Sequence, residues 1–230
     1  MQLPFVYVLI PAFNEAASIA NVIREIPLSL VKEIIVIDNG STDQTAQVVL
    51  NAGATLLSEP KKGYGRACLK GIEYLKGKAG DQDIIVFLDG DYSDFPQEMH
   101  LLLHPIQKDN VDLVIGSRVS WNRQPGSMLP QQVFGNWLAT RLIKVFYNVR
   151  FSDLGPFRAI RWAALEKINM QDKTFGWTVE MQVKAAKQNL ICSEVPVSYR
   201  KRIGVSKVSG TVKGTILAGY KILFTIFKNL

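Results

Sequence analysis

Short apolar runs alternate with amphipathic segments along the first half of the chain. The runs predict strands at residues 5–10, 34–38, 55–58, 84–89 and 113–117, and the segments between them predict helices at residues 16–25, 42–52, 64–75 and 96–107. Strands separated by helices of this length are typical of βαβ units, which build a mainly parallel sheet. We therefore expect an α/β protein whose sheet is flanked by helices.

After residue 117 the alternation is less regular. A loop rich in proline, glycine and glutamine is expected at residues 121–130, followed by helices at 133–146, 162–168 and 178–188, a strand at 194–200 and a final helix at 212–230. The chain has 230 residues, and single α/β domains of this size are ordinary. We expect one domain.

The final segment is both apolar and basic. Residues 195–230 contain seven lysine or arginine residues and no acidic residue. The charge of this segment, +7, therefore equals the net charge of the whole chain. Lys213, Lys221 and Lys228 interrupt the terminal helix, so its uncharged runs fall far short of the roughly 20 residues that span a bilayer. Such a helix fits the interface of an anionic membrane, and it fits a helix packed on the sheet equally well. Nucleic acid is not an expected partner, because no known binding motif accompanies the charge.

Cysteine usage bears on the compartment. The only cysteines, Cys68 and Cys192, are far apart in the sequence, which indicates a reducing compartment and no disulfide framework. The first ten residues lack the basic region and the cleavage site of a signal peptide. We expect a cytoplasmic protein that associates peripherally with a membrane.

Two acids follow the apolar run at residues 84–88. Side chains alternate along a strand, so Asp89 and Asp91 are expected to point the same way. Paired carboxylates form a hard-oxygen site that suits Mg²⁺ or Mn²⁺, and Mg²⁺ completes its shell with water and substrate phosphates. The plainer interpretation is a pair of turn acids that cap the next helix.

Polar segments stand at three of the predicted strand ends, at residues 11–15, 38–41 and 89–91. Ligands of parallel sheets bind at the carboxyl ends of the strands, so these segments are expected to converge on one site. The dinucleotide-binding fingerprint is absent, and the only similar fragment, at residues 63–65, is too short. His100 and His104 lack a third ligand and are weak evidence for zinc.

Three sequence segments carry a family resemblance. They are Pro-Ala-Phe-Asn-Glu at 11–15, Val-Ile-Asp-Asn-Gly-Ser-Thr-Asp-Gln-Thr at 36–45 and Phe-Leu-Asp-Gly-Asp at 87–91. Their order and spacing resemble the pattern of glycosyltransferase family 2 over about residues 4–118. The resemblance implies a GT-A fold, a nucleotide-sugar donor, inversion at the transferred sugar, and Mg²⁺ or Mn²⁺ as cofactor.

The resemblance also implies roles for individual residues. Asp89 and Asp91 would be the metal ligands and catalytic residues, Asp38 would hold the base and ribose, and a group of arginines and a lysine would clamp phosphates. The full set implied for substrate binding is Pro11, Asn14, Glu15, Asp38, Asn39, Gly40, Ser41, Arg66, Gly90, Arg118, Arg200, Arg202 and Lys207. Two positions depart from the family pattern: Asn39 replaces a second acid, and Ser93 replaces a frequent glutamine.

Later segments resemble the polyprenyl-phosphate sugar transferases, among them dolichyl-phosphate mannosyltransferase. The segments are Ile-Gly-Ser-Arg at 115–118, Gly-Pro-Phe-Arg-Ala at 155–159 and Gly-Val-Ser-Lys at 204–207. This resemblance implies transfer of mannose or glucose, from GDP-mannose or UDP-glucose, to a lipid phosphate at the cytoplasmic face of a membrane, and it leaves room for a membrane partner subunit. Met128 and Gln132 stand where lipid-phosphate members tend to carry an arginine and a serine.

On this interpretation the chain divides into functional parts. Residues 1–118 form the nucleotide-sugar half, 119–210 the acceptor half and 211–230 the terminal helix. Glu180 resembles the position of a catalytic base in other family members, which a hydroxyl acceptor needs and a phosphate acceptor does not. Transfer to a hydroxyl with Glu180 as base is therefore the alternative function. A purely structural explanation for Glu180 is that a glutamate is favoured at the positive end of a helix dipole.

Overall fold

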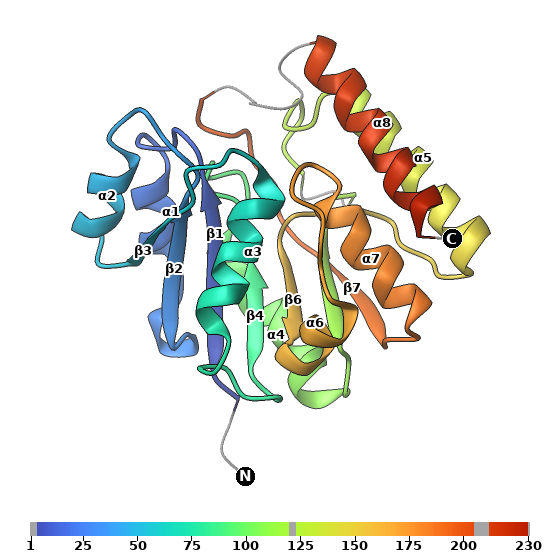
Figure 1. Ribbon diagram of the computed structural model, residues 1–230, viewed down its shortest axis with the longest axis horizontal. Helices are drawn as coiled ribbons and strands as arrows, with labels where there is room; N and C mark the ends of the chain where they lie inside the picture. The colour runs from blue at the N-terminus through green and yellow to red at the C-terminus, as the bar shows by residue number, and fades with distance from the viewer. Residues whose placement is uncertain (1–3, 120–122, 205–211, 230) are drawn as a thin grey trace.

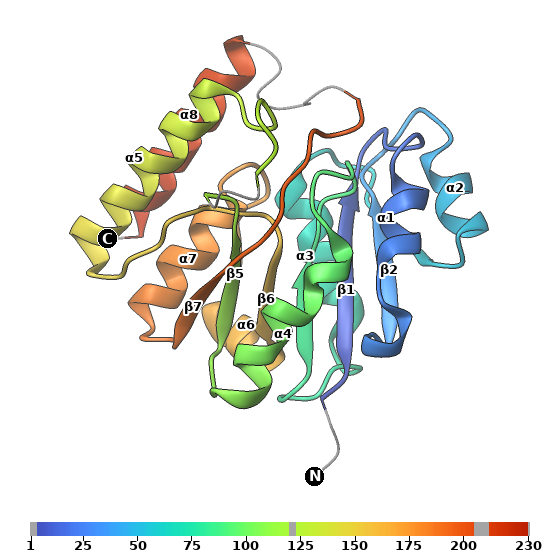
Figure 2. The same ribbon diagram turned by 180° about the vertical axis from the view of Figure 1, so that it is seen from behind.

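A sheet of seven strands with helices on both faces forms the centre of the computed structural model, which describes residues 4–119, 123–204 and 212–229 (Figures 1 and 2). The strand order is β3-β2-β1-β4-β6-β5-β7, and only β6 runs antiparallel to its two neighbours. The strands are β1 (Val6–Ala12), β2 (Glu33–Asp38), β3 (Thr55–Ser58), β4 (Ile84–Phe87), β5 (Leu113–Ser117), β6 (Arg158–Arg161) and β7 (Cys192–Pro196).

The two faces of the sheet are covered by different helices. Alternate residues of β1 show this: Leu9 packs in the core beneath α3, α6 and α7, and Val8 packs in the core beneath α1 and α4 (Figures 1 and 2). The helices are α1 (Ile19–Glu25), α2 (Thr45–Asn51), α3 (Tyr64–Leu75), α4 (Met99–Lys108), α5 (Pro130–Tyr147), α6 (Trp162–Ile168), α7 (Trp177–Lys187) and α8 (Val212–Lys228), with short 3-10 turns η1 (Leu28–Leu30) and η2 (Pro96–Glu98).

The expected α/β class is confirmed, and the apolar runs became the predicted strands. One strand was missed: β6 is only four residues long and begins and ends with arginine, so no apolar run or alternation marks it. The strand predicted at residues 84–89 ends at Phe87, so Asp89 and Asp91 lie in the loop after β4. The prediction that strand alternation aligns these two acids was wrong.

The register of the sheet brings three loops to one edge. β1 pairs with β2 so that Ala12 lies opposite Asp38, and it pairs with β4 so that Leu9 lies opposite Phe87. Because all three strands run parallel, the segments that follow them emerge side by side. The convergence expected from the sequence is therefore present in the fold.

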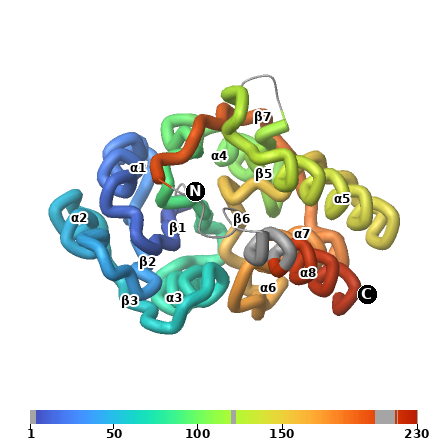
Figure 3. The backbone as a smooth tube through the Cα atoms, turned by 90° about the horizontal axis from the view of Figure 1, so that it is seen from above, coloured from blue at the N-terminus to red at the C-terminus, as the bar shows by residue number. Residues whose placement is uncertain are grey.

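Helices α5 and α8 lie side by side at one edge of the molecule (Figures 1 and 2). The Tyr147 hydroxyl of α5 donates to the Ile226 carbonyl of α8 at 2.7 Å. From above, α5, α7 and α8 gather on the side opposite to α2 and β3 (Figure 3). Within the described ranges, no helix has the length and apolar character that crossing a membrane requires.

Candidate functional site

The loops after β1 and β2 are bonded to each other. The Asn14 amide N–H donates to the Ser41 Oγ at 2.9 Å, and the Asn14 Oδ1 accepts the Thr42 N–H at 2.8 Å. The Asp38 carboxylate accepts the Ser41 N–H at 3.2 Å. Gly40 adopts a φ of +73°, and a side chain there would press on the Pro60 carbonyl. Asn14, Asp38, Gly40 and Ser41, all predicted as donor-binding residues, thus lie in one bonded unit.

The loop after β4 packs directly on the loop after β1. A Cβ atom at Gly90 would lie 3.5 Å from both the Pro11 carbonyl oxygen and the Glu15 Cγ. Glu15 is held in place by the Ser18 hydroxyl, which donates to its Oε2 at 2.9 Å. The structure therefore brings Pro11, Glu15 and Gly90 together with the two aspartates on either side of Gly90.

Asp89 and Asp91 are held by different partners. The Tyr64 hydroxyl, at the start of α3, donates to Asp89 Oδ1 at 3.0 Å. Asp91 accepts the backbone N–H and the hydroxyl of Ser93, at 2.9 Å and 2.5 Å, and its other oxygen lies 2.7 Å from the Arg202 guanidinium. Ser93, the residue found in place of a family glutamine, orients Asp91 here.

Negative charge accumulates around these acids. Burial and the neighbouring Asp91 raise the pKa of Asp89 to about 6, although Arg202 and Arg118 act in the opposite direction. Asp94 is only 2% exposed, and neither of its carboxylate oxygens has a hydrogen-bond partner among the described residues. Burial and Asp89 raise its pKa well above the ordinary value. A bound cation at this place would offset the repulsion.

The donor set fits a hard divalent cation. The described part of the chain contains no cluster of three or more histidine, cysteine, aspartate or glutamate residues arranged around one metal position. Mg²⁺ and Mn²⁺ in nucleotide sites need only one or two protein carboxylates, because phosphate and water oxygens complete the shell. Asp89 and Asp91 can supply these two ligands.

Arg118 is fixed by a buried carboxylate. Its Nε and Nη2 each lie 2.8 Å from one oxygen of Asp153, and its backbone N–H donates to the same group at 2.7 Å. Burial alone would raise the pKa of Asp153, but the Arg118 guanidinium holds that pKa below its ordinary value. A bidentate pair of this kind sets the orientation of the guanidinium, as phosphate recognition requires.

Asn39 has a structural task that explains the missing acid. Its amide group donates to the carbonyls of Glu59 and Lys61, both at 2.9 Å, and its oxygen accepts the Gly63 N–H at 2.7 Å. A carboxylate accepts hydrogen bonds but donates none when ionised, so an aspartate could not hold both carbonyls. Asn39 closes the segment 59–63 over the end of β2.

The predicted basic residues have different surroundings. Arg202 pairs with Asp91, whereas Arg200 pairs with Glu25 at 2.8 Å and donates to the carbonyls of Tyr92 and Asp94. Arg66 is half-buried on α3, and its guanidinium has no partner within the described ranges. Lys207 lies outside the described residues.

Glu180, in the first turn of α7, anchors a loop. Its carboxylate accepts the N–H groups of Gln171 and Asp172, the shortest bond being 2.7 Å, and it lies 2.9 Å from the Lys184 ammonium. The side chain is buried. A cavity of about 220 Å³ adjoins it, between this loop, α7 and α8.

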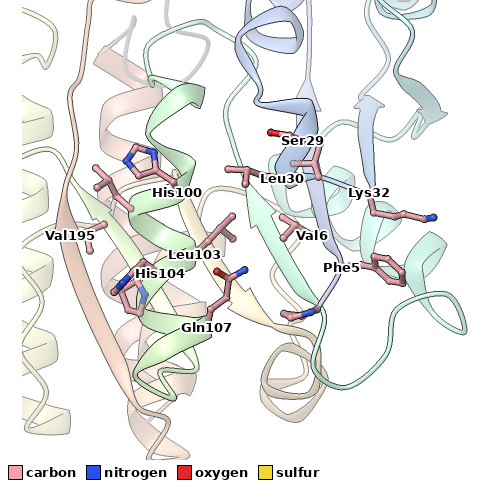
Figure 4. A pocket seen from close by; sticks show the side chains of 14 residues that line it. Phe5, Val6, Ser29, Leu30, Lys32, His100, Leu103, His104, Gln107 and Val195 are labelled. Atoms are coloured by element: carbon pink, nitrogen blue, oxygen red, sulfur yellow. The ribbon is translucent and has the colours of Figure 1, made fainter. Parts of the chain in front are cut away.

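A larger depression of about 880 Å³ lies along α4, the start of β1 and the η1 segment (Figure 4). Apolar side chains such as Leu103 and Val6 line it, together with His100, His104 and Lys32. None of the described residues that line it is a predicted site residue.

Sequence reasoning missed residues that the structure places in the site: Tyr64, Asp94 and Asp153. Asp94 follows the Asp-Gly-Asp segment closely in sequence, which was an available signal. The partnership of Arg118 with Asp153 joins positions 35 residues apart and has no local signal.

An α/β sheet of this order, with paired aspartates after its central parallel strand, is the GT-A fold of the glycosyltransferases. The chain belongs to glycosyl transferase family 2: its residues 7–169 match the model of that family. An uncharacterized glycosyltransferase of Mycobacterium tuberculosis is 33% identical over 217 residues, which cover 93% of this chain and 94% of that protein. The low-salt glycan biosynthesis hexosyltransferase Agl6 of Haloferax volcanii is 29% identical, over 92% of this chain and 51% of that protein.

Two solved structures show the same fold at lower identity. Glucosyl-3-phosphoglycerate synthase from Mycobacterium tuberculosis, in complex with Mn²⁺, UDP-glucose and phosphoglyceric acid, superposes with a TM-score of 0.77 at 21% identity, over 98% of this chain and 79% of its own. Mannosyl-3-phosphoglycerate synthase from Rubrobacter xylanophilus gives a TM-score of 0.80 at 18% identity, over 99% and 74%.

Proposed function

We propose that this protein transfers a hexose, mannose or glucose, with inversion from GDP-mannose or UDP-glucose to a polyprenyl or dolichyl phosphate. Asp89 and Asp91 would hold the Mg²⁺ or Mn²⁺ cofactor at the donor diphosphate. Membership of family 2 and the Mn²⁺ and UDP-glucose bound by a relative of the same fold support the donor and the metal. The acceptor rests on one observation, the outer surface of α5 and α8.

The α5–α8 surface consists of the large hydrophobic side chains that these two helices expose. Each is at least 41% exposed; they are Val133, Phe134, Trp137, Val145, Phe146, Leu217, Tyr220, Phe224 and Phe227. Phe146 of α5 meets Phe227 of α8 edge to face at 5.4 Å, so the exposed apolar side chains of the two helices touch at this end. A soluble monomer rarely exposes a large apolar patch without a partner.

The charge of the two helices indicates which partner this surface would bind. Helices α5 and α8 contain five basic residues and no acidic one: Arg141, Lys144, Lys213, Lys221 and Lys228. Exposed aromatic rings beside lysines are typical of helices that lie in the interface of an anionic membrane. In this proposal the protein lies on the cytoplasmic face of a membrane, alone or with a membrane-embedded partner subunit.

Helix α5 connects this surface to the site. Its buried Asn136 donates to the Ser152 carbonyl at 3.1 Å and accepts the Leu154 N–H at 2.8 Å. These two residues flank Asp153, which fixes Arg118. A phosphate that reaches the protein at the lipid surface would thus meet a preoriented guanidinium one helix away.

Transfer to a phosphate needs no catalytic base at the acceptor. The bound cation would supply positive charge against the leaving nucleoside diphosphate. Asp89 and Asp91 would bind it, Arg118 would orient the acceptor phosphate, and Arg202, which pairs with Asp91 in this structure, would turn to the donor phosphate. A phosphate oxygen is already an anion, so no residue must remove a proton from it. In this proposal Glu180 therefore has a structural role and not a catalytic one.

Transfer assays test the acceptor directly. Purified protein would be given radiolabelled GDP-mannose or UDP-glucose with Mn²⁺ and either dolichyl phosphate, dolichol or 3-phosphoglycerate. We expect label to enter the organic phase with dolichyl phosphate and not with dolichol, which differs only in the phosphate. Transfer to 3-phosphoglycerate alone, or equal transfer to dolichol, contradicts the proposal.

The second candidate is transfer to a hydroxyl group, with Glu180 as base. The phosphoglycerate bound by a relative of the same fold favours a small phosphorylated acceptor of this kind, and the basic residues around the site suit its phosphate. The same assay separates the two candidates, because this product stays in the aqueous phase.

A further inference from the structure

We propose that Tyr64 is a positioning residue for the metal site, whose hydroxyl sets the orientation of the Asp89 carboxylate and links it to the segment 172–174 of the acceptor half. The proposal rests on the metal-binding role of Asp89 in the proposed function. Its evidence is the geometry of one turn, Gly63-Tyr64-Gly65, at the start of α3.

The hydroxyl of Tyr64 holds one of the two oxygens of Asp89. The bond, 3.0 Å from the hydroxyl to Oδ1, leaves Oδ2 and the remaining lone pairs for a cation. Among the described residues, no backbone N–H donates to Asp89 in the way that the Ser93 N–H donates to Asp91. Hydrogen bonds from such outer residues fix the rotamers of metal ligands, and their loss typically costs 10–100-fold in metal affinity.

The glycines beside Tyr64 let another segment approach closely. A Cβ atom at Gly63 would lie 2.2 Å from the Lys173 carbonyl oxygen, and one at Gly65 would lie 2.0 Å from that of Asp172. Gly65 N–H donates to the Thr174 carbonyl at 3.2 Å. Only glycine fits at these two positions, so the residue between them is held by backbone contacts on both sides.

The same turn receives bonds from both halves of the protein. On the donor side, Asn39 accepts the Gly63 N–H at 2.7 Å. On the acceptor side, the segment 172–174 is tied to α8 by the ion pair of Asp172 with Lys221, at 2.8 Å. A chain of contacts therefore runs from Asp89 through Tyr64 and the segment 172–174 to Lys221 of α8.

A matched pair of variants isolates the hydroxyl bond. Tyr64→Phe removes the donor to Asp89. Tyr74→Phe is the control, because Tyr74 lies on the same helix and its hydroxyl donates to another carboxylate, Glu33, at 2.8 Å. Mn²⁺ binding is measured by electron paramagnetic resonance of the free ion and by calorimetry, in the presence of GDP or UDP, with melting temperatures recorded in chelator.

We expect Mn²⁺ to bind Tyr64→Phe about 10–100-fold more weakly than the wild type, and Tyr74→Phe to bind it unchanged, with similar melting temperatures for both variants. Saturating Mn²⁺ should restore transfer by Tyr64→Phe to within a few-fold of wild type, since only ligand orientation is lost. Asp89→Asn serves as the reference and should lose Mn²⁺ binding.

The outcomes separate the two claims. If Asp89→Asn loses Mn²⁺ and Tyr64→Phe binds it as the wild type does, the positioning role is overturned and the metal site stands. If Asp89→Asn binds Mn²⁺ normally, the metal assignment itself fails. A loss of affinity as large in Tyr74→Phe as in Tyr64→Phe would show a general effect on α3 and would also overturn the proposal.

Discussion

Replacing Glu180 with glutamine separates a structural anchor from a catalytic base. Glutamine has almost the same shape, but it keeps one oxygen and turns an amide group toward N–H donors. In the folded protein those donors are Gln171 and Asp172, and the lost charge also faces Lys184 at 2.9 Å. We therefore expect the variant to fold with reduced stability and to retain turnover.

The size of the stability loss follows from these contacts. A hydrogen bond to a charged group contributes about 1.5–3 kcal/mol net, and one such bond is lost together with an ion pair that is almost buried. A loss of about 2–4 kcal/mol lowers the melting temperature of a chain of this size by roughly 4–16 °C. Turnover with dolichyl phosphate should fall less than about threefold, whereas removal of a base costs about 10²–10⁴ in rate.

Differential scanning fluorimetry and initial rates, taken well below both melting transitions, measure the two effects. Glu166→Gln on α6 is the matched control, because Glu166 is exposed and should change neither quantity. A fall in kcat of a hundredfold or more in Glu180→Gln, with an unchanged melting temperature, would refute the anchor role and favour the hydroxyl acceptor.

Four further predictions can be tested separately. Asp91→Asn should lower transfer by about 10²–10³ or more and EDTA should inhibit the wild type, so full activity in chelator would exclude the metal. The protein should float with anionic liposomes at low salt but not with neutral ones, and Trp137→Ala with Phe224→Ala should weaken this; equal recovery with both vesicle types would contradict it. The pKa of Asp89 in the folded protein, about 6, exceeds its ordinary value of 3.8, so the folded state binds the proton more tightly than the unfolded state. Protonation of Asp89 should therefore raise the melting temperature in chelator as the pH falls from about 7 to about 5. Asp89→Asn should lack this contribution. Asn39→Asp should lower the free energy of unfolding by about 2 kcal/mol in urea titrations, because two donated bonds are lost; an unchanged midpoint would refute its anchoring role.

The parts of the fold that the sequence predicts correctly depend on local patterns. The buried strands β1, β2 and β4 are apolar runs, and parallel pairing carries the polar segments after them to one edge. Strand β6 could not be recognised in this way. Its Arg158 is completely buried, where it donates to the carbonyls of Gly155, Leu154 and Thr178. Rules based on hydrophobicity place such a residue at the surface.

The site shows the same limit. Motif spacing singles out Asp89 and Asp91 as candidates, but the partners that orient them come from distant segments: Tyr64 from α3 and Arg202 from beyond β7. Arg200 and Arg202 are two residues apart in sequence and have opposite surroundings, one bound to Glu25 and the other to Asp91. Charge alone could not distinguish them, because the difference arises from tertiary contacts.

The antiparallel strand β6 has a consequence for how the chain is made. β5 is synthesised before β6, yet it joins the rest of the sheet only through β6, since β4 and β5 each pair with that strand. At about 5–20 residues per second, the ribosome needs roughly 2–9 s to proceed from the end of β5 to the end of β6. During that interval β4 has an open edge, which is a template for wrong pairing with another nascent chain. The arrival of residues 158–161 closes this edge, because β6 pairs with both β4 and β5.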